Sequence, residues 1–544
     1  MKVGQLKVVV VEDEVGSRHI LKNLFRHAGV RHVDGLTNGQ ALLKQYDVID
    51  VDLLILGYDL GDQLRGPDLL RHLIRQQRLT PWTQVLFITN QVQAVEDELP
   101  GRLMPTRIMA KPVSLKLLIQ QIRETLLLRE HVKPLLQALA EEPCLARLRQ
   151  LLRLQAGHMP KASRDTIRII QTRILLDWGY AQEAWQLSAR VKSELMALEL
   201  RLELAYLLGK TNTVQQLLQQ MQEKQWLPRQ LDLYRWRMQA DAEQGTVPQQ
   251  LFFAQKESEL TPHEMNLSAI LRFQHQGYQA AVDYLQEKMG RAKGDHYQQN
   301  ALLITWISLT LLQALLPVST AVETVSLDRT QLALIARDLA NKLAWQHGAV
   351  DFKRFATLVD LAIVVTAEPT QPDWSEDLQQ MLLNSEQLDG FQCVWLAYIF
   401  LQLRQCKEAN QLLWHGDRRL MQMPMAPERL TIGFFHQQLF RFINPTAEQA
   451  AAQYLHWGSL YQQLKLWYRA LKMAYLALQL QPSADAAFML AELMGKLKLS
   501  SYRELDLGQL YQQLTTFELT ATQQLWLLRL QQPHHTSGLT TGIE

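Results

Sequence analysis

The stretch KVVVVEDE at residues 7–14 decides the fold of the N-terminal part of the chain. Its continuous run of β-branched residues is typical of a strand that helices cover on both faces, as in parallel sheets. A helix is predicted directly after this strand, because apolar residues recur at helical spacing at Ile20, Leu21, Leu24, Phe25 and Ala28. A strand followed by a helix is the unit from which parallel α/β sheets are built.

The same alternation continues to about residue 128. Further strands are predicted around Val33 and in DLLIL at residues 52–56, QVLFIT at 84–89 and TRIMA at 106–110. Helices are predicted near Ala41, in GPDLLRHLIRQQ at residues 66–77 and in SLKLLIQQIRETLLL at 114–128. We therefore expect an α/β fold of the flavodoxin-like type, with five parallel strands and helices on both faces of the sheet.

Polar residues stand where several of these strands end. In open parallel sheets, functional groups gather beyond the carboxyl ends of the strands, because the loops that follow neighbouring strands converge there. The residues at these ends are Glu12, Asp13, Gly57, Asp59, Thr89 and Lys111.

Four of these loops carry a specific resemblance. VEDE at residues 11–14, DLLILGYDL at 52–60, FITN at 87–90 and AKP at 110–112 resemble, in this order, the signature loops of response-regulator receivers. The resemblance implies that residues 1–128 form a receiver domain. In that family an acidic pair holds a magnesium ion, and an aspartate after the third strand accepts the phosphoryl group. A Thr or Ser hydroxyl contacts the phosphate and a lysine pairs with it.

By this resemblance, Glu12 and Asp13 match the acidic pair, Thr89 the switch hydroxyl and Lys111 the phosphate-pairing lysine. Phosphoryl transfer needs the cation and the ammonium group because both offset charge on the phosphate oxygens. Gly57, however, stands at the phosphoacceptor position, and glycine has no carboxylate that could form an acyl phosphate. The sequence therefore predicts a pseudo-receiver. Binding of Mg²⁺ by the acidic pair stays open.

Two alternatives concern the same loops. Asp59, two residues beyond Gly57, is a candidate substitute acceptor, although the family normally uses only a backbone carbonyl at that loop position. Alternatively, Lys111 simply pairs with Asp13 and the carboxylates are solvated loop residues. Two positions nearby also bear on the resemblance. Ile108 replaces the aromatic residue that usually accompanies switching, and Pro112 is a candidate for a cis Lys-Pro bond.

Beyond residue 128 the pattern changes to segments of helical period, rich in Leu, Gln and Ala and separated by short breaks. The sharpest instance is YLHWGSLYQQLKLWYRALKMAYLALQLQP at residues 454–482, whose spacing resembles a tetratricopeptide repeat. Small residues allow two antiparallel helices to approach, an aromatic side chain fills the space beside them, and proline ends the second helix. The residues in this repeat signature are Trp457, Gly458, Tyr461, Ala470, Ala477 and Pro482.

Weaker echoes of the pattern include Gly179 with Ala184, Gly277 with Ala281, and Ala397 with Ala409. We predict an all-α, tetratricopeptide-like region over residues 129–530 and a flexible tail over 531–544. A plain helical bundle is the alternative for the helical region. His534 and His535 in the tail have no third ligand nearby, which favours solvated side chains over a metal site.

Composition narrows the functional classes. Of the 544 residues 47% are hydrophobic, and the net charge is only +2, which disfavours both extensive disorder and nucleic-acid binding. Cys144, Cys393 and Cys406 form no metal-like or disulfide-like pattern, and the first residues lack a secretory signal, so we expect a cytoplasmic protein. Residues 301–322 are uncharged, but polar residues and Pro317 interrupt them, which favours a buried helix over membrane insertion.

A receiver joined to helical repeats resembles the Vie-type response regulators of bacteria. The resemblance implies a non-enzymatic signalling regulator that requires no cofactor. Repeat arrays present long surfaces suited to extended segments or helices. We therefore expect a phosphorylation-independent adaptor that binds or sequesters a protein partner. The alternatives are a response regulator phosphorylated on Asp59 and a nucleic-acid-binding regulator.

Overall fold

The structure is a computed structural model of the whole chain. It describes residues 3–45, 51–61, 65–75, 78–80, 82–92, 95, 106–141, 145–159, 163–178, 180–192, 194–224, 260, 262–291, 296–315, 328–343, 350–368, 375–422, 427–497 and 499–531. The tail with His534 and His535, as well as Cys144 and Gly179, lies outside the described residues.

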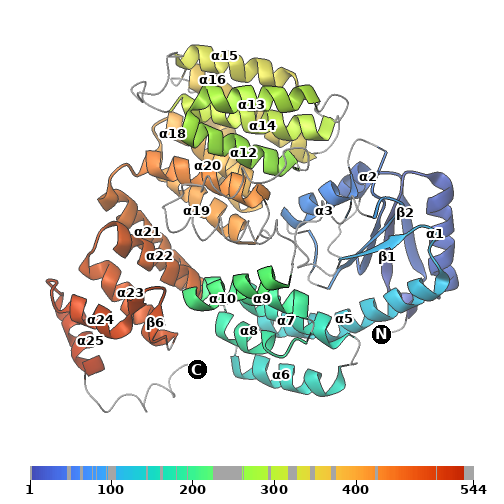
Figure 1. Ribbon diagram of the computed structural model, residues 1–544, viewed down its shortest axis with the longest axis horizontal. Coiled ribbons are helices and arrows are strands. Elements are labelled where there is room, and N and C mark those ends of the chain that lie inside the picture. The colour runs from blue at the N-terminus through green and yellow to red at the C-terminus, as the bar shows by residue number, and fades with distance from the viewer. Residues whose placement is uncertain are drawn as a thin grey trace. The chain divides into compact units, whose positions relative to one another are not determined.

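The N-terminal domain contains the predicted five-stranded parallel sheet (Figure 1). Its strands lie in the order β2-β1-β3-β4-β5, the order of flavodoxin-like folds. Their bounds are β1 (Lys7–Val11), β2 (His32–Leu36), β3 (Leu53–Leu56), β4 (Gln84–Thr89) and β5 (Thr106–Ala110). All four neighbouring pairs are parallel, which confirms the predicted fold class.

Helices cover both faces of the sheet. A short 3-10 turn at Val3–Gln5 precedes β1. On one face of the sheet, α1 (Val15–His27) and α5 (Leu115–Glu141) bury Phe25 and Leu118. On the other face α2 (Gly39–Gln45) and α3 (Gly66–Arg75) bury Leu42 and Leu70. Ile20, which the helical spacing placed among the apolar positions of α1, is 63% exposed. Helical period alone does not fix how wide the buried face is.

The helix α5 is longer than its sequence pattern indicated. It runs through residue 128 without a break, so the expected domain boundary lies inside one helix of 27 residues. Beyond residue 128, the Arg129 guanidinium forms an ion pair with the buried Asp52 carboxylate, and Lys133 lies over the Trp82 ring. These contacts attach the second half of α5 to the sheet domain. The helix α6 (Leu145–His158) follows.

The chain forms two compact units. Unit 1 comprises residues 1–171, 191–196 and 224–443, and unit 2 comprises residues 172–190, 197–223 and 444–544. Beside the sheet domain, unit 1 contains the helices α12 (Pro262–Gln276), α13 (Tyr278–Arg291), α14 (His296–Gln313), α15 (Arg329–Asn341), α16 (Val350–Ala367), α17 (Ser375–Leu383), α18 (Gly390–Gln402), α19 (Cys406–Gln422) and α20 (Pro427–Ile443), with a 3-10 turn at Ser385–Gln387.

Unit 2 is discontinuous in sequence. It contains parts of α7 (Arg164–Asp177) and α9 (Glu194–Leu207), together with α8 (Ala181–Ser188), α10 (Thr211–Glu223), α21 (Ala447–Gln463), α22 (Trp467–Leu480), α23 (Ala484–Lys496), α24 (Leu507–Leu514) and α25 (Ala521–Gln531). The sequence pattern had not indicated its short antiparallel hairpin, β6 (Ser501–Tyr502) with β7 (Leu505–Asp506). The hairpin packs on the turn before α10, because the Arg503 N–H donates to the Gly209 carbonyl at 3.1 Å.

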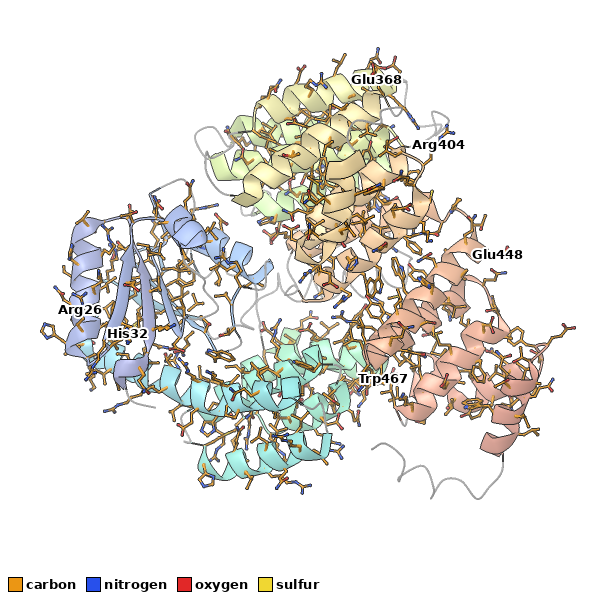
Figure 2. The ribbon with its side chains drawn as sticks, turned by 180° about the vertical axis from the view of Figure 1, so that it is seen from behind. Arg26, His32, Glu368, Arg404, Glu448 and Trp467 are labelled. Atoms are coloured by element: carbon orange, nitrogen blue, oxygen red, sulfur yellow. The ribbon has the colours of Figure 1, made fainter. Side chains whose placement is uncertain are left out.

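Four helix pairs share one kind of turn. A single residue with positive φ joins α9 to α10, α12 to α13, α18 to α19 and α21 to α22, namely Gly209, Gly277, Arg404 (labelled in Figure 2) and Lys465. In the first turn of each second helix a small or β-branched side chain is buried, namely Val214, Ala281, Ala409 and Ala470. The left-handed residue ends the first helix, and the small side chain allows the second helix to approach it closely.

The uncharged stretch from residue 301 forms the second part of α14 and is largely buried. Within the described part of the chain, no helix has the length and hydropathy needed to cross a membrane.

Candidate functional site

The sheet brings the predicted loop residues to one edge. Glu12 follows β1, Gly57 follows β3, Thr89 ends β4 and Lys111 follows β5, so all four lie at the carboxyl ends of parallel strands. Lys111 and Glu12 are 99 residues apart in sequence, and β3 and β4 lie between their strands, yet their side chains are in direct contact beyond the strand ends. The Lys111-Pro112 peptide bond is cis, as the sequence resemblance had suggested.

The centre of the site is an ion pair between Lys111 and Glu12. The Lys111 Nζ donates to Glu12 Oε1 at 2.6 Å, and the two side chains are 27% and 4% exposed. Burial raises the pKa of the Glu12 carboxyl, while the hydrogen bond and charge of Lys111 act in the opposite direction. The pairing with Glu12 corrects the alternative in which Lys111 pairs with Asp13.

The surroundings of Gly57 leave little space for a side chain. A Cβ atom on Gly57 would lie 3.0 Å from Glu12 Oε2 and 3.1 Å from the Asp59 carbonyl oxygen. On its other side, a Cβ on Gly66 would lie only 2.1 Å from the Gly57 carbonyl oxygen, so Gly66 is required for this close approach. The Glu12 carboxylate therefore occupies the space that a side chain at position 57 would enter.

Asp59 lies in the loop and does not take the place of a residue at the strand end. Its side chain is exposed and accepts a hydrogen bond from the Gly61 N–H at 3.1 Å. The loop is closed by the Gly66 N–H, which donates to the Tyr58 carbonyl at 2.7 Å, and by Arg65, which contacts the Tyr58 hydroxyl at 3.2 Å. This geometry keeps the Asp59 carboxylate in a local turn.

Thr89 and Asp13 have separate surroundings. The Thr89 hydroxyl is buried and accepts from the Gln91 N–H at 3.0 Å, and Asp13 is exposed beside Gly61. Arg18 was not predicted from the sequence; its guanidinium donates to the carbonyl oxygens of Glu12 and Asp13 at 2.6 and 3.1 Å. Arg18 fixes the backbone of the acidic loop. Its place on α1 gave no signal, because an arginine on a partly exposed helix face is common.

The donor set does not fit a magnesium ion. Mg²⁺ prefers several oxygen ligands in octahedral geometry. Here one carboxylate of the acidic pair is engaged by the Lys111 ammonium group, and Gly57 supplies no carboxylate. Over the described ranges, no group of three or more His, Cys, Asp or Glu side chains lies close enough to hold a metal ion.

The residues of the repeat signature lie together on α21 and α22 of unit 2. Trp457, Tyr461, Ala470 and Ala477 are buried. A Cβ on Gly458 would lie 3.6 Å from the Ala470 carbonyl oxygen, 3.5 Å from Met473 Cβ and 2.9 Å from Met489 Sδ, so the two helices approach closely at these positions. Pro482 is exposed just after the end of α22.

Comparison with known proteins bears on the N-terminal domain. Residues 8–123 match the family model described as "Response regulator receiver domain". No curated protein and no solved structure matches the chain. Receiver domains are generally non-catalytic signalling modules. The fold, the loop residues at the strand ends and this match identify the N-terminal part of the chain as a response regulator receiver domain.

Proposed function

We propose that the protein is a phosphorylation-independent adaptor, which binds or sequesters a protein partner through its helical region. The observation that carries the proposal is the Glu12–Lys111 ion pair beside Gly57. A phosphorylated receiver needs a carboxylate to accept the phosphoryl group and a free ammonium to pair with it. In this receiver the acceptor position has no side chain, and Glu12 already neutralises the ammonium group.

The pairing gives the receiver a fixed charge arrangement. The anion that pairs with Lys111 is supplied by the chain itself, so the contact does not depend on a phosphodonor. Magnesium is not required in this arrangement, and Glu12 and Asp13 act as structural residues. We infer that the receiver is a pseudo-receiver that serves as a constant structural module.

The helical region supplies the binding surface in this proposal. The four helix pairs with left-handed turns and the close approach at Gly458 support a tetratricopeptide-like organisation. Such arrays bind extended or helical protein segments. The combination is similar to that of the Vie-type response regulators, and we propose a bacterial, cytoplasmic protein that binds neither nucleic acid nor membranes.

Small-molecule phosphodonors with magnesium provide the first test. We expect intact mass spectrometry of the full chain to show no phosphoryl adduct, because position 57 carries no carboxylate. The Asp59→Asn variant is the matched control. A stoichiometric, acid-labile adduct that disappears in this variant would establish phosphorylation of Asp59 instead and refute the proposal.

Partner capture provides the second test. The full chain and its Lys111→Ala variant are used as bait in the native cell, and both should retain the same partner to nearly the same extent. The reason is that no phosphoryl group contacts Lys111. Loss of the partner beyond any loss of folded protein, or the absence of any specific partner, would contradict the adaptor function.

A further inference from the structure

The helix α25 is attached to the rest of unit 2 through one face. The Gln523 side-chain amide donates to the Asp485 carboxylate on α23 at 3.0 Å. The Trp526 ring packs edge-on against Phe488 of α23 and Tyr511 of α24, with ring centroids 4.7 and 6.2 Å apart. These contacts determine which side of α25 faces its neighbours α23 and α24 (Figure 1).

The opposite face of α25 carries an exposed apolar stripe, formed by Ala521, Leu525 and Leu528. These residues are spaced i, i+4 and i+7, so they lie within about 60° of one another around the helix. Leu525 and Leu528 are 59% and 57% exposed, and Ala521 is exposed as well. The residues on either side of the stripe, Thr522 and Gln524, are exposed and uncharged. This spacing is that of the positions at which two helices meet in a coiled coil.

The stripe distinguishes α25 from the other described helices. On α1, the exposed Val15 and Ile20 are five positions apart, which places them about 140° apart around the helix. On α5, the exposed Leu115 and Leu117 are two positions apart, which places them about 160° apart. Single exposed apolar side chains are common on protein surfaces. In the rest of the described chain, the large apolar side chains that are exposed stand singly, at Leu154, Trp178, Leu334, Leu383 and Leu464.

The helix α25 thus has apolar residues on two opposite faces. Trp526 and the buried Leu527 lie on the inner face, and the stripe lies on the outer face. A helix that is apolar on all sides is normally buried on all sides, and a helix at the end of a repeat array needs a polar outer face to stay soluble. With 11 residues, α25 is too short to cross a membrane. We therefore expect another helix to cover the stripe.

We propose that the stripe of α25 packs against the same stripe of a second copy of the chain and forms a dimer with twofold symmetry. The order of side-chain sizes along the stripe favours this occupant. When two copies of α25 lie antiparallel about an axis near Leu525, the small Ala521 of each copy lies opposite the large Leu528 of the other. Large side chains then pack against small ones, as a close helix contact requires.

Charge favours the same occupant. The stripe and its neighbours Thr522 and Gln524 carry no charge, so two identical faces do not repel, and a charged partner surface would gain nothing from them. The residues that follow α25, QPHHTSGLTTGIE at 532–544, include Pro533, Gly538 and Gly542, which disfavour a helix that could cover the stripe. The inference goes beyond the proposed function. A dimer presents the helical region twice and thereby increases the avidity for a partner with two binding sites.

Sedimentation velocity of the full chain tests the proposal. A contact between two short helices is a small interface, so we expect association in the micromolar range, with the average mass rising towards twice that of the monomer between about 1 and about 100 µM. The Leu525→Glu/Leu528→Glu variant places four carboxylates in the contact and should associate at least about tenfold more weakly. Both leucines are exposed in the single chain, and circular dichroism checks that the variant is folded.

The matched control is Leu334→Glu/Leu383→Glu, which makes the same two changes at leucines of α15 and α17 that are 56% and 83% exposed. This control should associate like the wild type. A wild-type chain that stays monomeric throughout the concentration range would overturn the inference. So would a dimer that the changes at Leu525 and Leu528 leave intact, because its interface would then lie elsewhere.

Disulfide cross-linking tests the symmetry of the contact. Because the twofold axis passes near residue 525, Leu525→Cys should give a disulfide-linked dimer under mild oxidation. Leu383→Cys, at a more exposed position, should not exceed the background that the wild type sets through its exposed Cys406. Equal cross-linking of the two cysteine variants would contradict the proposal. A chain without residues 532–544 that dimerises when the full chain does not would also overturn it, because the tail would then be the segment that covers the stripe.

Discussion

The Glu12 carboxylate is almost fully enclosed, and its charge is balanced by the Lys111 ammonium at 2.6 Å. Replacing Lys111 by Met would leave a buried carboxylate without its cation. Such a change should lower the free energy of unfolding of the receiver by about 1–3 kcal/mol at neutral pH. Urea denaturation measures the loss, and Lys116→Met, an exposed lysine on α5, is the matched control. A loss no larger than that of the control would contradict the role assigned to the ion pair.

The folding stability of the Lys111→Met variant should depend on pH in a defined direction. Burial already raises the pKa of Glu12 above its usual value, and removal of Lys111 takes away the interactions that lower it. The folded variant then binds a proton more readily than the unfolded chain, so its stability increases as the pH falls towards the raised pKa. The difference between wild type and variant should therefore shrink between about pH 7 and about pH 5. A constant difference would refute this account.

His436 on α20 gives the opposite pH dependence. It is buried, its Nε2 lies 2.7 Å from the Leu413 carbonyl oxygen, and burial lowers its pKa despite the nearby Asp417. The unfolded chain therefore binds the proton more readily, and stability is lost as the pH falls below about 6.5, by at most about 1.4 kcal/mol per pH unit. His436→Gln keeps an amide donor for Leu413 and should reduce this slope.

Thermal or urea unfolding between about pH 7 and about pH 5 measures the effect of His436→Gln. The exposed His27→Gln is the control and should keep the wild-type slope. Part of the slope should remain in His436→Gln, because burial also lowers the pKa values of His131 and His415. An unchanged slope would exclude His436 as a source of the pH dependence.

The loop residues show which parts of the site could be predicted from the sequence. The loop positions Glu12, Thr89 and Lys111 follow from strand patterns and motif order, and the structure places them at one edge of the sheet. The choice of Glu12 over Asp13 as the partner of Lys111 does not follow from them. It depends on which carboxylate the loop turns inward, and Arg18 fixes that loop through backbone carbonyls.

At the scale of elements, the effect of charge near the N-terminus of α6 on the stability of this helix can be measured directly. Arg147→Glu places an anion near the positive end of the helix dipole, which should stabilise α6 by about 0.3–1 kcal/mol. Native-state hydrogen exchange of the amides in residues 145–158 provides the measurement, and Arg147→Gln should give a smaller gain of the same sign. Faster exchange in the Glu variant would show that Arg147 stabilises the helix.

The close approach of α21 and α22 gives a second measurement. Ala470 is fully buried beside Gly458, so Ala470→Leu should force the helices apart at a cost of about 1–3 kcal/mol. Hydrogen exchange should become faster in α21 to α23 while the receiver strands keep their protection. Ala447→Leu, at an exposed position of α21, is the control. Uniform loss of protection along the chain would favour a single cooperative bundle over a repeat organisation.

Element boundaries were less predictable than element types. All five strands of the receiver were predicted close to their observed places, because short apolar runs between helical segments are a strong local signal. The end of α5, in contrast, was not predicted. Its apolar residues continue at helical spacing through Leu128, Val132 and Leu135, and the helix accommodates Pro134. The residues that follow TLLL thus contain no signal that would end the helix at the predicted position, residue 128.

At the scale of the whole molecule, unit 2 depends on distant parts of the chain. Lys472 on α22 lies over the Tyr206 ring of α9, and the hairpin residue Tyr502 packs on Gly209. A chain truncated after residue 443 would lack α21 to α25, so α8 to α10 should lose much of their hydrogen-exchange protection. The receiver strands should be unaffected. Full protection of α8 to α10 in the truncated chain would contradict the composition of unit 2.

This long-range pairing could not be predicted from sequence. Helical period is a local property, and it identifies amphipathic segments without stating which segments pack together. The sequence pattern therefore predicts one continuous helical region over residues 129–530. The structure instead combines segments before residue 224 with segments after residue 443.

The hydrogen bond between Arg503 and Gly209 also implies a delay between the synthesis of the two parts of unit 2. The two residues are about 290 positions apart, and translation proceeds at roughly 5–20 residues per second. The α8 to α10 segment thus leaves the ribosome roughly 15–60 s before its C-terminal partners exist. During that interval its apolar face has no native cover and is a target for chaperones or aggregation. The five receiver strands, by contrast, all lie within residues 7–110 and are synthesised close together in time.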